Sequence, residues 1–199
     1  MLGVSYLINL HHLKWQKMAL LQDKLLFTKA DIAKAREISA NITEAKIEPY
    51  IRETQSLSVR TFLGDQLYLL LLNDYTVLSN TFASQRFTDL WFGSDYTNSN
   101  GVTVRQNGLK IAAIYFCYGQ FILQQNTNVG RYGVGSLNQT DTETSGTSTV
   151  RTKKNQSDSI ALNYQAAVGL FLNDKATTYP EWQTKTTTGQ KIAAPFFKV

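Results

Sequence analysis

The sequence contains little of the chemistry on which most enzymes depend. Among its 199 residues there is one cysteine, Cys117, and the only histidines are the neighbours His11 and His12. A single thiol can form neither an internal disulfide nor a cysteine-based zinc site. Two adjacent imidazoles without a third argue against histidine-based triads and against the His-Glu-x-x-His zinc motif. We therefore expect no catalytic residue, no metal ion and no cofactor.

Long apolar runs are also missing from the sequence. The run Leu67 to Leu72 has six residues and the run Ile111 to Tyr118 has eight, whereas a membrane-spanning helix needs about 20. The segment Met1 to Leu13 has no basic start, so it is a poor match to a secretory signal. Gly130, Gly133 and Gly135 lack the spacing of a Rossmann or Walker phosphate loop. We expect no membrane span, no secretory signal and no small-molecule ligand.

Acidic side chains are scarce in the second half of the chain. Residues 1–99 carry ten Lys or Arg and ten Asp or Glu, whereas residues 100–199 carry ten basic and five acidic residues, so the whole surplus of +5 lies there. This surplus predicts a moderately basic face suited to DNA or to an acidic protein surface. A soluble protein with a basic tail is the simpler interpretation, because the densest basic cluster is too small to count as a nucleic-acid motif. The candidate DNA contacts are Arg131, Arg151, Lys153 and Lys154.

Helical periodicity dominates the middle of the chain. Thr28 and Asp31 are typical of a helix start, and that helix is predicted to run to about residue 39. Asn41 and Glu44 form a capping-box-like pair before a second helix. Further helices are predicted over residues 65–73, 82–92, 109–125 and 150–174. The helix over 109–125 is expected to be central and buried, with Cys117 as a small buried side chain.

Two segments depart from the helical pattern. Residues 94–107 predict a β-hairpin, because Asn100-Gly101 is typical of a two-residue type I′ turn with positive φ. Residues 126–149 are rich in Gly, Asn, Thr and Ser and predict a long loop or a loose hairpin. The expected fold class is mainly α: a compact helical bundle with a β-hairpin insertion, a long polar loop and extended N- and C-terminal arms.

The predicted organisation is an N-terminal arm over residues 1–27, a helical domain over 28–175 and an extended C-terminal tail over 176–199. Apolar and aromatic side chains in the arm, hairpin, loop and tail are candidate contacts with a partner. Phe196 and Phe197 at the chain end either fold back on the domain or anchor in a neighbouring molecule. The candidate interface residues are Trp15, Leu21, Tyr96, Val102, Val104, Tyr132, Val134, Trp182, Phe196 and Phe197.

The order of these elements resembles a family of tailed-phage head–tail connector proteins, also called adaptor or neck ring proteins, of the crAss-like phage type. The matching stretches are "IEPYIRETQ", "FLGDQLY", "FGSDYTNSNGVTVRQNGLKIAAIYFCYGQFI", "NTNVGRYGVGSLN" and "YPEW". The resemblance covers about residues 26–199, and the order of the stretches carries it rather than any single motif.

The resemblance implies a mechanical role. Members of that family are mostly helical, have no known catalytic residues, and form a ring of generally about twelve copies beneath the portal. The implied partners are identical subunits, the portal protein or another neck or tail ring protein, and packaged DNA bound without sequence preference. The implied location is the virion neck, after assembly in the host cytoplasm. The alternative is a small DNA-binding accessory protein that acts through its basic second half and binds in a salt-sensitive way.

Overall fold

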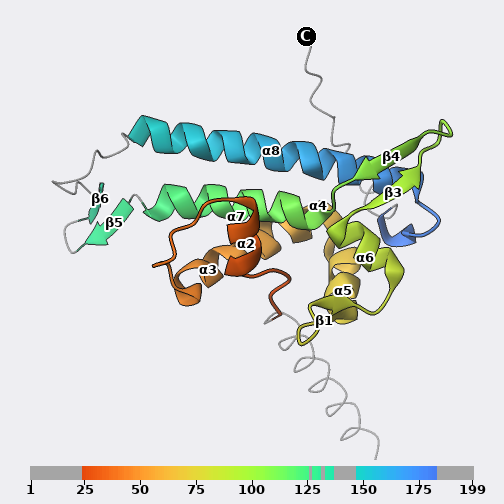
Figure 1. Cartoon of the computed structure of the whole chain (residues 1–199), viewed down its shortest axis with the longest axis horizontal. Helices are drawn as coiled ribbons and strands as arrows, with labels where there is room; N and C mark the ends of the chain where they lie inside the picture. The colour runs from red at the N-terminus through yellow and green to blue at the C-terminus, as the bar shows by residue number, and fades with distance from the viewer. Residues whose placement is uncertain (1–23, 126, 131–132, 137–146, 183–199) are drawn as a thin grey trace, which may run out of the picture.

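Helices dominate the computed structural model of the chain (Figure 1). The structure describes residues 24–125, 127–130, 133–136 and 147–182. The helical elements are α2 (Lys29–Ala35), α3 (Glu44–Thr54), the π-helix η1 (Gln55–Val59), α4 (Arg60–Leu63), α5 (Asp65–Asp74), α6 (Gln85–Phe92), α7 (Leu109–Gln125) and α8 (Thr147–Asp174). The strands are β1 (Tyr75–Thr76), β2 (Thr81–Phe82), β3 (Ser94–Thr97), β4 (Thr103–Gln106), β5 (Thr127–Gly130) and β6 (Gly133–Ser136). The prediction of a mainly helical fold with a hairpin insertion is confirmed.

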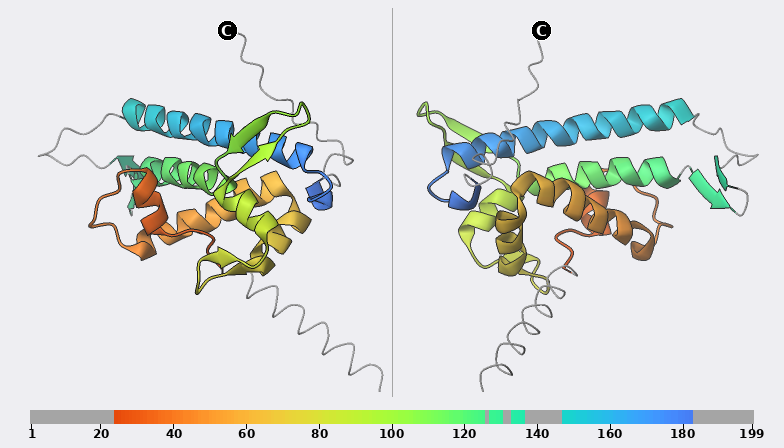
Figure 2. Two further views of the ribbon diagram at one scale, coloured as in Figure 1. Left: turned by 45° about the vertical axis from the view of Figure 1, so that its right-hand side comes forward. Right: turned by 180° about the vertical axis from the view of Figure 1, so that it is seen from behind.

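Helix α7 lies at the centre of the molecule. α8 runs along one side of it, while α2, α3 and η1 cover another side and α6 packs near its start (Figures 1 and 2). Small residues let the two long helices approach closely. A Cβ on Gly119 of α7 would lie 3.0 Å from Oδ1 of Asp158 on α8, and the Ser157 hydroxyl donates to the Tyr115 carbonyl at 2.8 Å. The predicted central helix is confirmed, and Cys117 on it is fully buried.

The core begins earlier in the chain than the predicted arm boundary. Leu26 and Phe27 are fully buried, and the Gln55 side chain holds this segment by accepting from the Leu26 N–H at 2.8 Å. The Lys24 ammonium donates to the carbonyls of Leu72 and Tyr75 at 2.9 and 2.8 Å. Residues 24–27 therefore belong to the helical domain, and the assignment of all of 1–27 to an arm is wrong at this end.

The first two helices differ in detail from the prediction. The Asp31 carboxylate accepts from the Thr28 N–H at 3.0 Å, so the predicted start is correct. The helix ends at Ala35, not near residue 39. Asn41 and Glu44 do not form a capping box, because the N-cap residue is Thr43, directly before Glu44, and the Glu44 carboxylate accepts from the Lys29 N–H at 3.2 Å. Glu44 therefore connects α3 to α2.

Three antiparallel hairpins join the helices. The first pairs Tyr75 with Phe82, and this pairing delays α6 to Gln85, three residues later than predicted. The second is the predicted hairpin, in which Tyr96 pairs with Val104. The third, β5 with β6, lies in the polar segment 126–149, for which a loop or a loose hairpin is predicted. α8 then begins at Thr147, three residues before its predicted start.

The C-terminal tail does not begin at residue 176 as predicted. Tyr179 and Trp182 are 1% and 8% exposed and belong to the core. The Trp182 ring lies 5.1 Å from the Phe62 ring, and its indole N–H donates to the Asn173 side-chain oxygen at 2.8 Å. These contacts hold residues 176–182 against the helical domain, so the prediction of an extended tail is wrong for them.

Candidate functional site

The base of the β3–β4 hairpin is a close crossing of two backbone segments. A Cβ on Gly108 would lie 2.3 Å from the Trp91 carbonyl oxygen, and one on Gly93 would lie 2.5 Å from the Gln106 carbonyl oxygen. Both glycines also have positive φ, +96° at Gly93 and +83° at Gly108. The Gln106 side chain fixes the crossing by donating to the Asp89 carbonyl and accepting from the Gly108 N–H at 2.5 and 2.6 Å. The hairpin is therefore held rigidly on α6 and α7.

The tip of this hairpin differs from the predicted type I′ turn. That turn needs positive φ at both central residues, and Gly101 has it at +77° whereas Asn100 does not. The Asn98 side chain instead accepts from the N–H groups of Asn100 and Val102, both at 3.0 Å. Val102 at the tip is 57% exposed, as a contact residue would be.

Two of the predicted interface residues in this region face inward. Tyr96 is 8% exposed, and its ring meets the Phe171 ring edge-on at 5.1 Å. Val104, which pairs with it across the hairpin, is half-buried against the same core. Trp182 is buried as described above. The predictions that Tyr96 and Trp182 contact a partner are wrong, because both side chains attach surface segments to the chain's own core.

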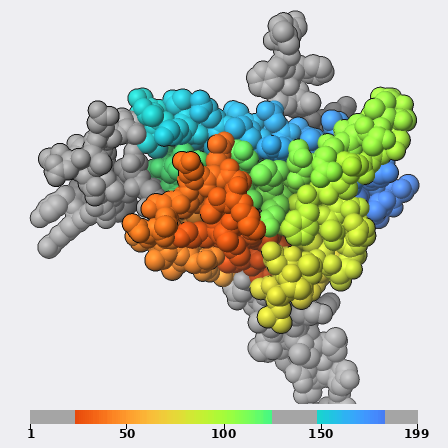
Figure 3. Space-filling model, in the orientation of Figure 1, coloured from red at the N-terminus to blue at the C-terminus, as the bar shows by residue number. Residues whose placement is uncertain are grey.

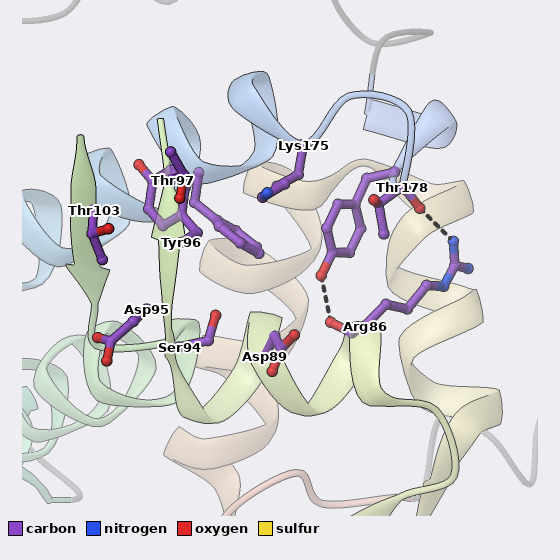
Figure 4. A pocket seen from close by; sticks show the side chains of 11 residues that line it. Arg86, Asp89, Ser94, Asp95, Tyr96, Thr97, Thr103, Lys175 and Thr178 are labelled. Carbon is purple, nitrogen blue, oxygen red and sulfur yellow. Dashed lines mark hydrogen bonds between the residues drawn. The ribbon is translucent and has the colours of Figure 1, made fainter. Parts of the chain in front are cut away.

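A pocket of about 440 Å³ lies between α6, the β3–β4 hairpin and the end of α8 (Figure 4). Arg86 projects from α6 and donates to the Thr178 carbonyl at 3.1 Å, and it pairs with Glu181 at 3.3 Å. The Tyr179 hydroxyl donates to the Arg86 carbonyl. Burial raises the pKa of Tyr179, so this hydroxyl keeps its proton. These groups attach residues 176–182 to α6.

A second groove, of about 680 Å³, lies where α2, α7 and α8 meet. The Arg36 guanidinium stacks 4.5 Å from the Tyr115 ring centre and 5.8 Å from that of Tyr118. Lys153 lines the same groove and is exposed, as is Arg151 beside it. This end of α8 therefore presents a small group of cations.

Not every predicted DNA contact is available in this way. Lys154 is half-buried and forms an ion pair with Asp158 one turn further along α8. Its charge is balanced within the helix, which makes Lys154 less available to DNA than Lys153. Arg131 lies outside the described residues, as do Trp15, Leu21, Tyr132, Phe196 and Phe197. Val134 lies in β6.

Several large apolar side chains are exposed on the described surface. Leu78, in the β1–β2 turn, is fully exposed, and its neighbour Val77 is 54% exposed. In the space-filling view this turn projects at the lower edge, and the β3–β4 tip projects at the upper right (Figure 3). Leu57, Leu162 and Leu170 are also more than half exposed. Of this group the sequence predicts only Val102 as a contact residue, because exposure on a helix depends on which face packs inward.

The remaining candidate chemistry in the described part of the chain is limited. Burial raises the pKa of Cys117 to about 12, so the thiol is protonated and unreactive. Within the described residues no cluster of His, Cys, Asp and Glu is arranged to hold a metal ion. None of the helices described has the length and apolar character needed to cross a bilayer.

Comparison with known proteins identifies one relationship. Residues 60–192 match the model of a family described as a family of unknown function, DUF6712. The matched region starts at α4 and includes α5 to α8. It therefore contains the base of the β3–β4 hairpin and the α8 residues that line both pockets. No curated protein and no solved structure matches the chain.

Proposed function

The chain belongs to the DUF6712 family, and we propose that it is a virion structural protein that forms a ring in the head-to-tail connector of a tailed phage. The ring of identical subunits, about twelve as in the adaptors it resembles, sits below the portal and joins the capsid to the tail. Its other contacts are the portal protein or a second neck or tail ring. In this role the chain works in the virion neck and carries out no reaction.

The observation that supports this proposal best is where the exposed apolar side chains lie. Leu78 and Val102 occupy the tips of two hairpins that project from different edges of the molecule (Figure 3). A closed ring needs two different complementary surfaces on every subunit, because each copy meets two neighbours through different patches. The glycine crossing at Gly93 and Gly108 makes the longer hairpin a rigid projection. Rigid projections with apolar tips suit repeated subunit contacts, since little conformational entropy is lost on binding.

The proposal includes a share of the DNA channel. Arg151 and Lys153 are exposed at the start of α8, next to the groove that contains Arg36. Cations in such a position contact phosphate without reading sequence. The same group of residues is the specific reason to keep the second candidate, a DNA-binding accessory protein, in which a free monomer uses this end of α8.

Light scattering coupled to size-exclusion chromatography, followed by negative-stain imaging, tests the proposal. We expect a closed ring many times the mass of the 22.4 kDa chain, either alone or on adding the partner ring. A gel shift with duplex DNA at low and high salt runs beside it. A strictly monomeric protein that binds DNA tightly, with affinity falling steeply as salt rises, would replace the connector with the accessory protein.

A further inference from the structure

The outer face of α8 lacks charge over most of its length. Residues 159–173 contain no Asp, Glu, Lys or Arg, and at 1.5 Å per residue they extend for about 22 Å. The exposed side chains among them lie on one side of the helix, because their spacing keeps them within about a third of a turn. They are Ser159, Leu162, Asn163, Ala166, Leu170 and Asn173.

This face has no cover among the described residues. α8 packs inward along α7 and meets β4 near its C-terminal end, while its outer side stays open in all three ribbon views (Figures 1 and 2). Leu162 and Leu170 are 53% and 63% exposed, two turns apart with Ala166 between them. A solvated helix face normally carries charged residues. A face that lacks charged residues and exposes leucines has the composition of the core of a protein interface.

The chain leaves the described structure beside this face. Trp182 is bound to Asn173, which is the last exposed residue of the charge-free face. The seventeen residues that follow divide into two parts. Residues 183–191 are polar, and residues 192–197 read Ile-Ala-Ala-Pro-Phe-Phe. The segment has three lysines and no acidic residue, so it suits a face without charge better than a basic one.

The length of the polar part favours docking on the α8 face of a neighbouring copy over docking on the chain's own α8. Nine extended residues span about 30 Å, whereas Leu170 lies about 5 Å along the helix from Asn173. A chain of this size is about 40 Å across. The spacer is much longer than an approach to its own helix needs, and it is comparable to the step from one subunit to the next.

We propose that the C-terminal segment 192–197 of one copy docks on the charge-free α8 face of the neighbouring copy, with Phe196 and Phe197 against Leu162 and Leu170. This contact rests on the proposed ring, since it is head-to-tail and repeats around a closed assembly. The proposal identifies the surface that segment 192–197 binds. The α8 face is then one of the two complementary patches that each subunit needs.

Two full-length variants and their mixture test the contact. The face variant carries Leu162→Gln and Leu170→Gln, and the tail variant carries Phe196→Ser and Phe197→Ser. The matched control is Leu57→Gln, because Leu57 and Leu170 are both 63% exposed and Leu57 lies on η1. Light scattering at a concentration where the natural sequence forms rings measures the mass of each.

We expect each variant alone to fall to the mass of a single chain, while Leu57→Gln keeps the ring. The mixture is the decisive sample. The intact tail of the face variant can bind the intact face of the tail variant, but the resulting pair cannot extend further. An equimolar mixture should therefore give a species of about twice 22.4 kDa. Rings from either variant alone, or a mixture that stays monomeric, would overturn the inference.

A cross-link provides a second measurement that does not depend on removing apolar side chains. Chains carrying Ala166→Cys are mixed with chains carrying Phe197→Cys, and Cys117 does not interfere because it is fully buried. A covalent dimer should form on oxidation, and Ser56→Cys in place of Ala166→Cys should give none. A double variant that closes a disulfide within one diluted chain would refute docking between copies. A natural sequence that stays monomeric at every concentration, both alone and with the partner ring added, would instead refute the proposed ring.

Discussion

The glycine crossing at the base of the β3–β4 hairpin gives a sharp prediction about stability. Gly101 and Gly108 have nearly equal positive φ, +77° and +83°. An alanine Cβ at Gly101 meets nothing within 4 Å, whereas at Gly108 it would lie 2.3 Å from the Trp91 carbonyl oxygen. The substitutions Gly101→Ala and Gly108→Ala therefore both place an alanine at a similar positive φ and differ mainly in the close approach.

The size of the difference follows from these two contributions. Positive φ costs an alanine about 1 kcal/mol, and this is partly offset because alanine restricts the unfolded chain. Gly101→Ala should lower the free energy of unfolding by about 1 kcal/mol or less. Gly108→Ala must also displace the end of α6, where Trp91 is fully buried against Phe27 and Phe82. Overpacking of this kind adds about 2 kcal/mol, for a total near 3 kcal/mol.

Urea unfolding followed by tryptophan fluorescence measures both variants, because Trp91 and Trp182 report on the core. In thermal unfolding, about 2 kcal/mol between them corresponds to about 6 °C in Tm for a chain of this size. Equal losses in the two variants would refute the argument, since they would mean that the crossing relaxes without cost. An unchanged slope of free energy against urea would show that the same folded state is being compared.

Three further predictions concern buried groups. Burial raises the pKa of Asp31, but hydrogen bonds from Lys110 and Thr28 outweigh this effect and lower the pKa below 3.8. Lys110→Met should therefore lower the free energy of unfolding by about 2 kcal/mol at neutral pH. In urea titrations the difference in free energy between this variant and the natural sequence should shrink as the pH falls below about 4. Cys117, whose pKa burial raises to about 12, should resist iodoacetamide near pH 8 in the folded protein and react fully in denaturant, as intact mass will show. Trp182→Ala should cost about 3 kcal/mol in urea unfolding, whereas Trp182→Phe keeps a ring against Phe62 and should cost less, about 2 kcal/mol, through the lost bond to Asn173 and the smaller volume.

The elements that the sequence predicts well are those whose pattern is local. Helices over 65–73 and 109–125 match α5 and α7 to within a residue, because their apolar spacing and the flanking glycines lie in the same short stretch. The hairpin over 94–107 is also local, but its turn type is not settled by Asn100-Gly101. The Asn98 side chain accepts from the Val102 N–H, which a type I′ turn over Asn100-Gly101 would use. A rule based on the Asn-Gly pair alone does not take that competing acceptor into account.

The errors arise where distant residues decide burial. Tyr179 and Trp182 look like part of a polar, threonine-rich tail, yet the Tyr179 hydroxyl binds the carbonyl of Arg86, ninety-three positions earlier. Lys24 reaches carbonyls about fifty positions later in the chain. Neither partner can be inferred from the spacing around the residue itself. The charge-free run over 159–173 is visible in the sequence, but only the packing of α8 on α7 shows that its exposed residues share one face.

The distribution of polar contacts is the reason to assign the function to surfaces. Around the 440 Å³ pocket, the Arg86 guanidinium and the Tyr179 hydroxyl are bound to groups of the chain itself. A catalytic site needs such groups held ready for a substrate, in a geometry that substrate binding completes. The apolar groups show the opposite arrangement, because Leu78, Val102 and Leu170 face outward from rigid elements. Exposed apolar area gains free energy only when another surface covers it, and this arrangement supports the proposal that these surfaces bind partners.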